Sequence, residues 1–237
     1  MAFFHVVIPA AGAGTRMQKS GIANALPKQY LPLAGKPIIS HTIQVFFNHP
    51  RIASIHLALH PDDEFWRSLT LETASKLKLH YTGGKSRSET VLNTLNVLDV
   101  AEDDWILVHD AARPGLTLVL LDNLLNALEN DAVGGLLALP LADTLKLADA
   151  ENRVEKTIPR TDLWQAQTPQ MFKYGILKHA LQTNIHAASR PAFTDEAEAI
   201  EAQGLQPKLV QGELRHLKVT YPQDLTILEA LFKQEQT

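Results

Sequence analysis

The chain has 237 residues, 45% of them hydrophobic and 20% charged, which is typical of an ordinary globular protein with one α/β domain. Its formal net charge of −4 at pH 7 disfavours a general nucleic-acid binder, and the absence of cysteine excludes disulfides, thiolate catalysis and cysteine-based zinc sites. We find neither a signal peptide nor an apolar run long enough to cross a bilayer, and therefore expect a cytoplasmic protein with no membrane or nucleic-acid partner.

The first predicted element is a short buried strand at 5–8, whose residues are apolar and largely β-branched. The small residues Ala-Ala-Gly-Ala-Gly follow at 10–14, and Arg16 comes soon after. Without bulky side chains the backbone can come close to a ligand, and Gly12 and Gly14 can take positive φ. Such a loop presents backbone N–H groups to phosphate, and Arg16 adds a positive charge. The pattern therefore favours a nucleotide-binding loop.

Two better-known phosphate loops do not match the sequence. The dinucleotide fingerprint fails because its third glycine would fall at Met17. The P-loop pattern has the right ending at 84–86, but Leu79 stands where its first glycine is required.

Further along the chain, strands and helices alternate. A polar connector at 18–26 precedes a helix that Pro37 opens and Asn48 to Pro50 ends. We then predict, in chain order, a strand at 52–59, a short helix from Pro61, a weak strand at 79–81, a helix at 86–98 with a Ser86–Glu89 capping box, a strand at 105–108, a helix at 117–129 and a strand at 134–139. After these come a strand at 164–168, a helix near 173–183, a helix at 194–203, short strands at 208–211 and 217–219, and a terminal helix at 222–234.

This alternation predicts a Rossmann-like, doubly wound and mostly parallel sheet. Ligands of such sheets bind at the carboxyl ends of the strands. The segments 12–16 and 110–113 both follow predicted strands, so we expect them to lie at the same edge.

The pattern changes at Asp143. Polar and apolar residues alternate over 144–147 and 154–158, on either side of a turn at 149–152, which predicts a β-hairpin inserted in the α/β order. A lone two-stranded hairpin is marginal in water, so this arm, at about 142–161, is expected to pack on something. The pattern alone leaves open whether it packs on its own domain or on a second subunit. We find no linker, and treat 1–237 as a single domain.

Five short motifs occur in order along the whole chain. They are Pro-Ala-Ala-Gly-x-Gly-x-Arg-Met at 9–17, Pro-Lys-Gln-Tyr at 27–30, Val-His-Asp-Ala-Ala-Arg-Pro at 108–114, Thr-Pro-Gln at 168–170 and Leu-Lys-Val-Thr at 217–220. Together they resemble the 2-C-methyl-D-erythritol 4-phosphate cytidylyltransferases of the non-mevalonate isoprenoid pathway. That family joins CTP to methylerythritol phosphate with Mg²⁺, giving a CDP-alcohol and pyrophosphate.

The resemblance implies a role for each matching residue. Arg16 and Lys28 would stabilise the transition state, although a lone lysine such as Lys28 would otherwise be taken for a solvated surface residue. The CTP-binding positions would be Ala10, Ala11, Gly12, Gly14, Gly84, Arg87, Thr90 and Ala111. Those for methylerythritol phosphate would be Arg113, Thr144, Arg160, Thr168 and Lys218, with Arg160 and Lys218 also counted as catalytic.

The resemblance also implies a metal site and a dimer. Asp110 is the best candidate for a Mg²⁺ ligand, because a hard cation takes carboxylate and phosphate oxygens together; alternatively it caps the turn after its strand. Glu213 is a possible second ligand. Thr144 and Arg160 belong to the arm, which in that family reaches into the partner subunit, so a homodimer is expected. His109 is expected to be structural.

Two departures from the family pattern stand out: the connector 18–26 is long, and His216 stands where asparagine is common. The alternative functions are a cytidylyltransferase for another polyol phosphate, such as ribitol 5-phosphate, and a non-catalytic nucleotide-sensing dimer.

Overall fold

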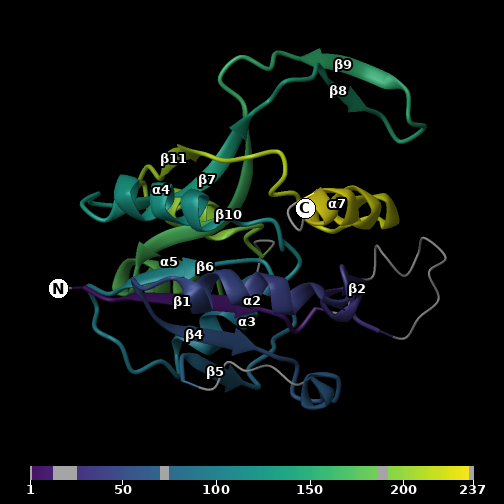
Figure 1. Cartoon of the computed structure of the whole chain (residues 1–237). Coiled ribbons are helices and arrows are strands. Elements are labelled where there is room, and N and C mark those ends of the chain that lie inside the picture. Colours follow the sequence, from purple (N-terminus) through teal and green to yellow (C-terminus); the bar gives the residue numbers. More distant parts are fainter. Residues whose placement is uncertain (1, 13–25, 70–74, 186–191, 235–237) are drawn as a thin grey trace.

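A computed structural model of the chain describes residues 2–12, 26–69, 75–185 and 192–234. Its centre is a seven-stranded sheet in the order β11-β7-β10-β6-β1-β4-β5 (Figure 1). Strand β10 runs antiparallel to both of its neighbours, and the other pairs are parallel, which confirms the expected α/β class. The strands are β1 (Phe4–Pro9), β4 (Ile52–Ala58), β5 (Leu77–His80), β6 (Trp105–Val108), β7 (Gly134–Pro140), β10 (Trp164–Lys173) and β11 (Lys208–Gln211).

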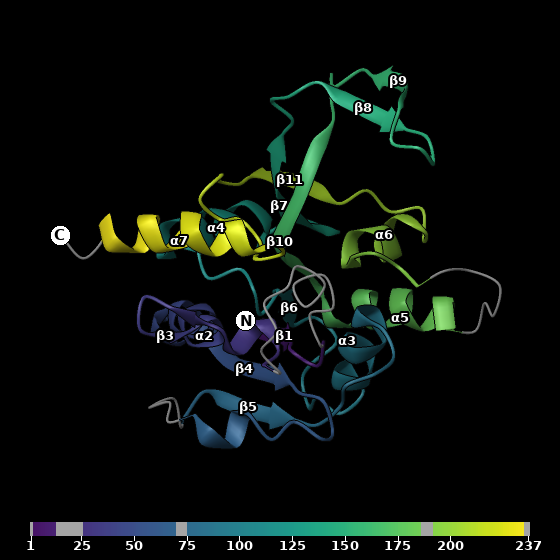
Figure 2. The same ribbon diagram turned by 90° about the vertical axis from the view of Figure 1, so that its right-hand side faces the viewer.

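Helices cover both faces of this sheet (Figure 2). One face packs against α2 (Ile38–Asn48) and α4 (Leu118–Leu128). The other packs against α3 (Arg87–Leu95), α5 (Tyr174–Ile185) and α6 (Glu196–Glu201). The remaining elements are the 3-10 turns η1 (Lys28–Tyr30) and η2 (Trp66–Ser68), the short strands β2 (Pro32–Leu33) and β3 (Lys36–Pro37), and the C-terminal helix α7 (Pro222–Gln234). No helix of the described residues is long and apolar enough to cross a membrane.

Strand β1 lies at the centre because both of its faces are apolar. Val6 and Ile8 are fully buried in the core beneath α2 and α4, while Val7 is fully buried in the core beneath α3 and α5. Alternate side chains of a strand point to opposite faces, so this near-continuous apolar run can serve two cores at once. The carboxyl ends of β6, β1 and β4 consequently lie side by side.

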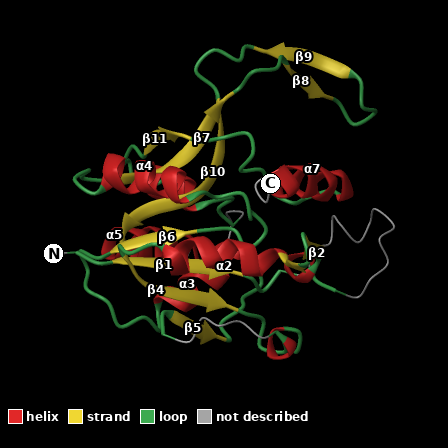
Figure 3. Cartoon of the chain, viewed as in Figure 1, coloured by secondary structure: helices red, strands yellow, loops and turns green. Residues whose placement is uncertain are grey.

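The predicted hairpin is present. Strands β8 (Leu145–Ala148) and β9 (Val154–Ile158) form a two-stranded sheet of their own, which projects from the body of the protein (Figures 1 and 3). Strands β7 and β10 lead into it and remain paired out to Trp164 opposite Pro140. Apolar side chains on the arm are exposed, with Val154 63% accessible.

The prediction of a strand at 164–168 was too short, and that of a strand at 217–219 was wrong. Strand β10 continues through Pro169 to Lys173, because it is paired with β7 on one side and β6 on the other. Residues 217–219 have no neighbouring strand, and Val219 instead donates a single backbone hydrogen bond to the Ala112 carbonyl, at 2.8 Å. The short helix expected from Pro61 is the 3-10 turn at Trp66.

A chain of hydrogen-bonded side chains crosses the sheet below its carboxyl edge. His5 Nδ1 lies 2.7 Å from Ser54 Oγ, Ser54 Oγ lies 2.7 Å from His56 Nε2, and His56 Nδ1 lies 2.9 Å from His80 Nε2. Burial lowers the pKa of all three histidines, that of His56 to about 3. They are therefore neutral in the folded protein near pH 7.

We expect this row of hydrogen-bonded histidines to make the protein less stable in mild acid. Between the unfolded pKa of 6.5 and the folded value of about 3, His56 binds a proton more readily in the unfolded chain, so the free energy of unfolding falls as pH falls. Between about pH 6.5 and about pH 5, His56 alone lowers the free energy of unfolding by about 2 kcal/mol. Urea denaturation over this range should show a flatter pH slope for His56→Leu than for the control, His179→Gln. Equal slopes would contradict the assignment.

Candidate active site

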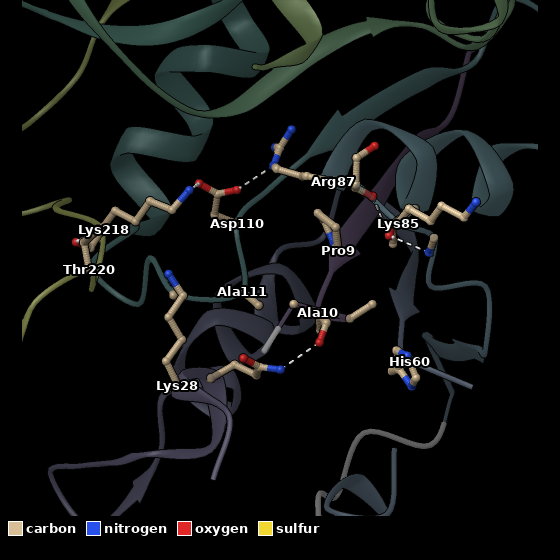
Figure 4. Close-up of a pocket in the computed structure, with 17 residues that line it drawn as sticks. Pro9, Ala10, Lys28, His60, Lys85, Arg87, Asp110, Ala111, Lys218 and Thr220 are labelled. Atoms are coloured by element: carbon tan, nitrogen blue, oxygen red, sulfur yellow. Dashed lines mark hydrogen bonds and ion pairs between the residues drawn. The ribbon is translucent and has the colours of Figure 1, made fainter. Parts of the chain in front are cut away.

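A cleft of about 540 Å³ opens at the carboxyl edge of the sheet (Figure 4). It is walled by the segments that follow β1, β4 and β6, by η1, by the start of α3 and by residues 218–220. Its lining residues are Pro9, Ala10, Ala11, Gly12, Lys28, Gln29, His60, Gly84, Lys85, Ser86, Arg87, Thr90, Asp110, Ala111, Ala112, Lys218 and Thr220. Ten of the residues singled out from the sequence are among these seventeen.

The small-residue segment after β1 forms the floor of the cleft. Ala10 donates its N–H to the Ala58 carbonyl at 2.8 Å and accepts a 2.7 Å hydrogen bond from Gln29 Nε2 at its own carbonyl. A Cβ built on Gly12 would meet none of the described residues within 4 Å, so on their side the backbone is open to a ligand. Gly14 and Arg16 lie outside the described residues.

One wall is the turn that precedes α3. Thr90 is buried, and its hydroxyl accepts a hydrogen bond from Gly84 N at 2.9 Å while donating one to the Ser86 carbonyl at 2.9 Å. Ser86 caps the helix by accepting from Glu89 N, but Glu89 Oε2 accepts from Lys85 N rather than from Ser86 N. In this capping box, the acidic side chain therefore accepts from the residue before the N-cap and not from the N-cap itself. Thr90 holds the turn in shape in addition to any contact with a ligand.

Gly83 is a residue of this wall that the sequence analysis did not single out. A Cβ on it would lie 2.6 Å from the Ala11 Cβ and 3.0 Å from the Leu59 carbonyl oxygen, and neither neighbour can rotate away. The three atoms nearest to a Cβ on Gly84 all belong to the Glu89 side chain, at 2.6, 2.8 and 2.9 Å, so no backbone atom is among its closest contacts.

Gly83→Ala should therefore push the turn away from the floor of the cleft. We expect a loss of about 1–3 kcal/mol in unfolding free energy, together with weaker CTP binding. Calorimetric titration with CTP and thermal denaturation measure the two effects. The matched variant, Gly84→Ala, should be milder in both, and a greater loss at Gly84 would show that the close approach at Gly83 is unimportant.

Asp110 is the centre of a cluster of charges. It follows β6, and its carboxylate lies 2.9 Å from Arg87 Nε, 2.7 Å from Lys218 Nζ and 3.4 Å from Arg113 Nε. Burial alone would raise the pKa of Asp110, but the positive charges of Arg87, Lys218 and Arg113 outweigh it and hold the pKa well below its usual range. The carboxylate is therefore ionised, and the cations around it are held at the cleft.

Lys28 and Lys218 lie on the same side of the cleft, opposite Lys85 and His60 (Figure 4). Lys28 Nζ donates a 2.9 Å hydrogen bond to the Val219 carbonyl, next to Lys218 in the chain. An anion that entered the cleft would meet both ammonium groups, so the arrangement favours a polyphosphate.

Arg113 and Thr168 lie behind Asp110 and are buried, not part of the cleft lining. Arg113 donates to the carbonyls of His216 and Ala166, at 3.1 and 3.5 Å. The Thr168 hydroxyl accepts from Asp110 N at 3.1 Å and bonds His109 Nδ1, also at 3.1 Å. Both side chains thus fix the backbone around Asp110.

His109 and His216 stack in this buried layer, with ring centroids 5.4 Å apart. Burial lowers the pKa of both, that of His216 to about 4, so both rings are neutral near pH 7. His216 Nε2 bonds the Thr168 carbonyl. Both contacts fit structural histidines.

The arm residues Thr144 and Arg160 are exposed, and neither lines the cleft of this single chain. Glu213, considered as a second metal ligand, is also outside the lining, and its carboxylate lies 3.9 Å from Arg215 Nε. Among the described residues, no group of three or more histidine, aspartate or glutamate side chains could hold a metal on its own.

Two further residues support the cleft and were missed in the sequence: Gln29, which is in its lining, and Glu196, which is not. Gln29 holds Ala10, as described above, and Glu196 contacts Arg87, at 2.7 Å from Nη1. Gln29 could have been found from the sequence, because it belongs to the Pro-Lys-Gln-Tyr motif at 27–30. No local pattern around Glu196 could have revealed its partner, which lies 109 residues away.

A doubly wound sheet with a small-residue floor and a cationic cleft at its carboxyl edge defines a nucleotide-binding transferase fold. The chain matches the model of the family described as "IspD: 2-C-methyl-D-erythritol 4-phosphate cytidylyltransferase" over residues 4–234. It belongs to that family.

Curated relatives and solved structures agree with this assignment. A 2-C-methyl-D-erythritol 4-phosphate cytidylyltransferase of Nitrosospira multiformis is 50% identical over 98% of this chain and 99% of its own length. One of Dechloromonas aromatica is 48% identical over 97% of each chain. A crystal structure of a 4-diphosphocytidyl-2C-methyl-D-erythritol synthase superposes with a TM-score of 0.83 at 37% identity, covering 98% of this chain and 99% of the other. The Francisella tularensis enzyme gives a TM-score of 0.81 at 32% identity, covering 100% of both chains.

Proposed function

We propose that this chain transfers the cytidylyl group of CTP to 2-C-methyl-D-erythritol 4-phosphate. A phosphate oxygen of the alcohol phosphate attacks the α-phosphorus of CTP, the bond from that phosphorus to the bridging oxygen of the β-phosphate breaks, and pyrophosphate leaves. The products are 4-diphosphocytidyl-2-C-methyl-D-erythritol and pyrophosphate. The observation that carries the proposal is that three cations, Arg87, Lys218 and Lys28, line one cleft at the carboxyl edge of the sheet, in a chain of this family.

The cleft supports a mechanism of positioning and charge stabilisation. Two polyanions have to be brought together, so fixed cations must offset their repulsion and the charge that develops on the leaving pyrophosphate. Lys28, and Arg16 from outside the described residues, are proposed to stabilise the transition state, and Lys218 and Arg160 to place the attacking phosphate. No nucleophilic side chain is required.

The remaining proposed contacts divide between the two substrates. The floor and the turn would bind CTP through Ala10, Ala11, Gly12, Gly14, Gly84, Arg87, Thr90 and Ala111. Methylerythritol phosphate would be held by Thr144, Arg160 and Lys218, with Arg113 and Thr168 as supports behind Asp110.

Asp110, together with phosphate oxygens of CTP, would hold the Mg²⁺ ion that the family uses. Asp110 is the one carboxylate among the described residues that line the cleft, and it is ionised, but it already faces three cations. One carboxylate plus substrate phosphates is a usual donor set for Mg²⁺. The residues present therefore fit a metal shared with CTP, which would offset phosphate charge, better than a metal bound before CTP.

We further propose that 1–237 is one nucleotidyltransferase domain, and that the arm, at about 142–161, completes the site of a second subunit in a homodimer. The proposal is supported by the exposed apolar side chains of the arm and by Arg160, which is exposed and is not among the described residues that line the cleft of its own chain.

Mixing two inactive variants tests the shared site. Lys28→Ala disables the cleft and Arg160→Ala disables the arm, so a mixed dimer has one site with an intact cleft and an intact arm. Random exchange should restore about a quarter of wild-type activity, since half of the dimers are mixed and half of their sites are intact. No recovery after subunit exchange would refute the arrangement.

The reaction is tested by pyrophosphate release with CTP and Mg²⁺. Release with methylerythritol 4-phosphate but not with ribitol 5-phosphate is the expected result. Release with ribitol 5-phosphate alone would keep the chemistry and change the substrate, and no release with either would favour a nucleotide sensor.

A further inference from the structure

Glu196 is a charged side chain with no access to solvent. Its exposed fraction is 0%, and its Oε1 lies 2.7 Å from Arg87 Nη1. An ionised carboxylate is costly to bury unless it is paired, so a residue of this kind needs a specific partner. The partner here lines the cleft, although Glu196 itself does not.

Arg87 connects Glu196 with Asp110. Its Nη1 faces Glu196 and its Nε lies 2.9 Å from Asp110 Oδ1, so two carboxylates on different elements hold one planar guanidinium. The third nitrogen, Nη2, is buried and has no hydrogen-bond partner among the described residues, and the same holds for Glu196 Oε2. With Asp110 alone, the long side chain of Arg87 could rotate toward the cleft. The second contact prevents that rotation.

The backbone around Glu196 is also tightly held. Gln170 of β10 donates to Asp195 Oδ2 at 2.9 Å and accepts from Ala197 N at 2.8 Å, on either side of Glu196. Gln170 is paired with Val108 of β6, the strand that Asp110 follows. Glu196 and Asp110 are thus positioned from adjacent strands, which sets the distance that Arg87 spans.

Glu196 also sets the charge of the cluster. Arg87, Arg113 and Lys218 supply three positive charges against two negative ones from Asp110 and Glu196, giving a net charge of +1. Without the Glu196 charge the net value is +2, and Arg87 becomes a competitor of Lys218 for incoming phosphate.

We propose that Glu196 is a positioning residue, which holds Arg87 on Asp110 so that Asp110 keeps the Lys218 ammonium in place for the reaction. This inference rests on the proposed cytidylyl transfer. Glu196→Gln keeps the shape and removes the charge. It should lower kcat about 10- to 100-fold and change the KM for CTP by a smaller factor, because the other CTP contacts survive while the alignment of Lys218 is lost.

The experiment compares Glu196→Gln in two backgrounds. In the wild-type background it should lower kcat, and in an Arg87→Met background it should change kcat less than about twofold, since its only route to the site is removed. Glu196→Asp should recover part of the activity, and Glu201→Gln, an exposed acid on the same helix, should behave like the wild type. Equal losses in both backgrounds, or a loss of thermal stability with kcat unchanged, would overturn the proposal.

A second readout does not depend on turnover. The Nε–Hε signal of Arg87 in a ¹⁵N NMR spectrum, assigned by its absence from Arg87→Met, should be protected from solvent exchange in the wild type and exchange faster in Glu196→Gln. Unchanged protection would refute the positioning role. A wild-type protein that binds CTP but releases no pyrophosphate would refute the proposed function alone.

Discussion

Replacing Lys28 by alanine is expected to lower kcat by about 10²- to 10³-fold, while the dissociation constant of CTP changes little. Lys28 is followed directly by two buried anchors: Gln29 donates to the Ala10 carbonyl at 2.7 Å, and the Tyr30 hydroxyl donates to Asp63 Oδ2 at 2.7 Å. The backbone of Lys28 is therefore fixed, and its ammonium is placed in the cleft before substrate arrives. A charge placed in advance acts most strongly on the charge that develops in the transition state.

Steady-state kinetics and calorimetric CTP titration separate the two effects. Lys36→Ala, an exposed lysine nearby in the chain, serves as the control and should match the wild type. A variant of Lys28 that bound CTP weakly yet turned over at the normal rate would mean that the lysine binds the ground state.

The second large effect is expected for Asp110→Asn, which should lower the free energy of unfolding by about 3 kcal/mol or more. The carboxylate is 7% exposed and is shared by three cations, which would be left without their common partner. The same change should reduce turnover, because Lys218 loses the contact that orients it.

Urea denaturation with and without CTP tests this account. The triphosphate should restore more stability to D110N than to the wild type, because an anion can replace the missing charge. Asp62→Asn, whose side chain is 92% exposed, is the control and should leave both values unchanged. Full wild-type stability of D110N in the absence of CTP would contradict the role given to the cluster.

Most elements were predictable because their patterns are local. The strand at 105–108 and the helix at 222–234 were predicted with the bounds that the structure shows, the first from a continuous apolar run and the second from its amphipathic spacing. The strand through Pro169 was not predictable, since proline normally ends a strand and only pairing on both sides carries it on. The segment at 217–219 has the composition of a strand but no partner.

The candidate site was predictable to the extent that its motifs lie next to strand ends. The floor at Ala10 to Gly12 and the acid at Asp110 follow β1 and β6, so the topology brings them together. The pairing of Glu196 with Arg87 joins α6 to α3, which lie 109 residues apart, so no local spacing encodes it. Nor could the sequence show that the Thr90 hydroxyl is already engaged by the turn that it supports.

Strand β10 forms one side of the base of the arm, supplies Thr168 behind Asp110, and brackets Glu196 through Gln170. A shift of one residue in its register would disturb all three at once. In evolutionary terms, this strand can change only as a unit with its partners.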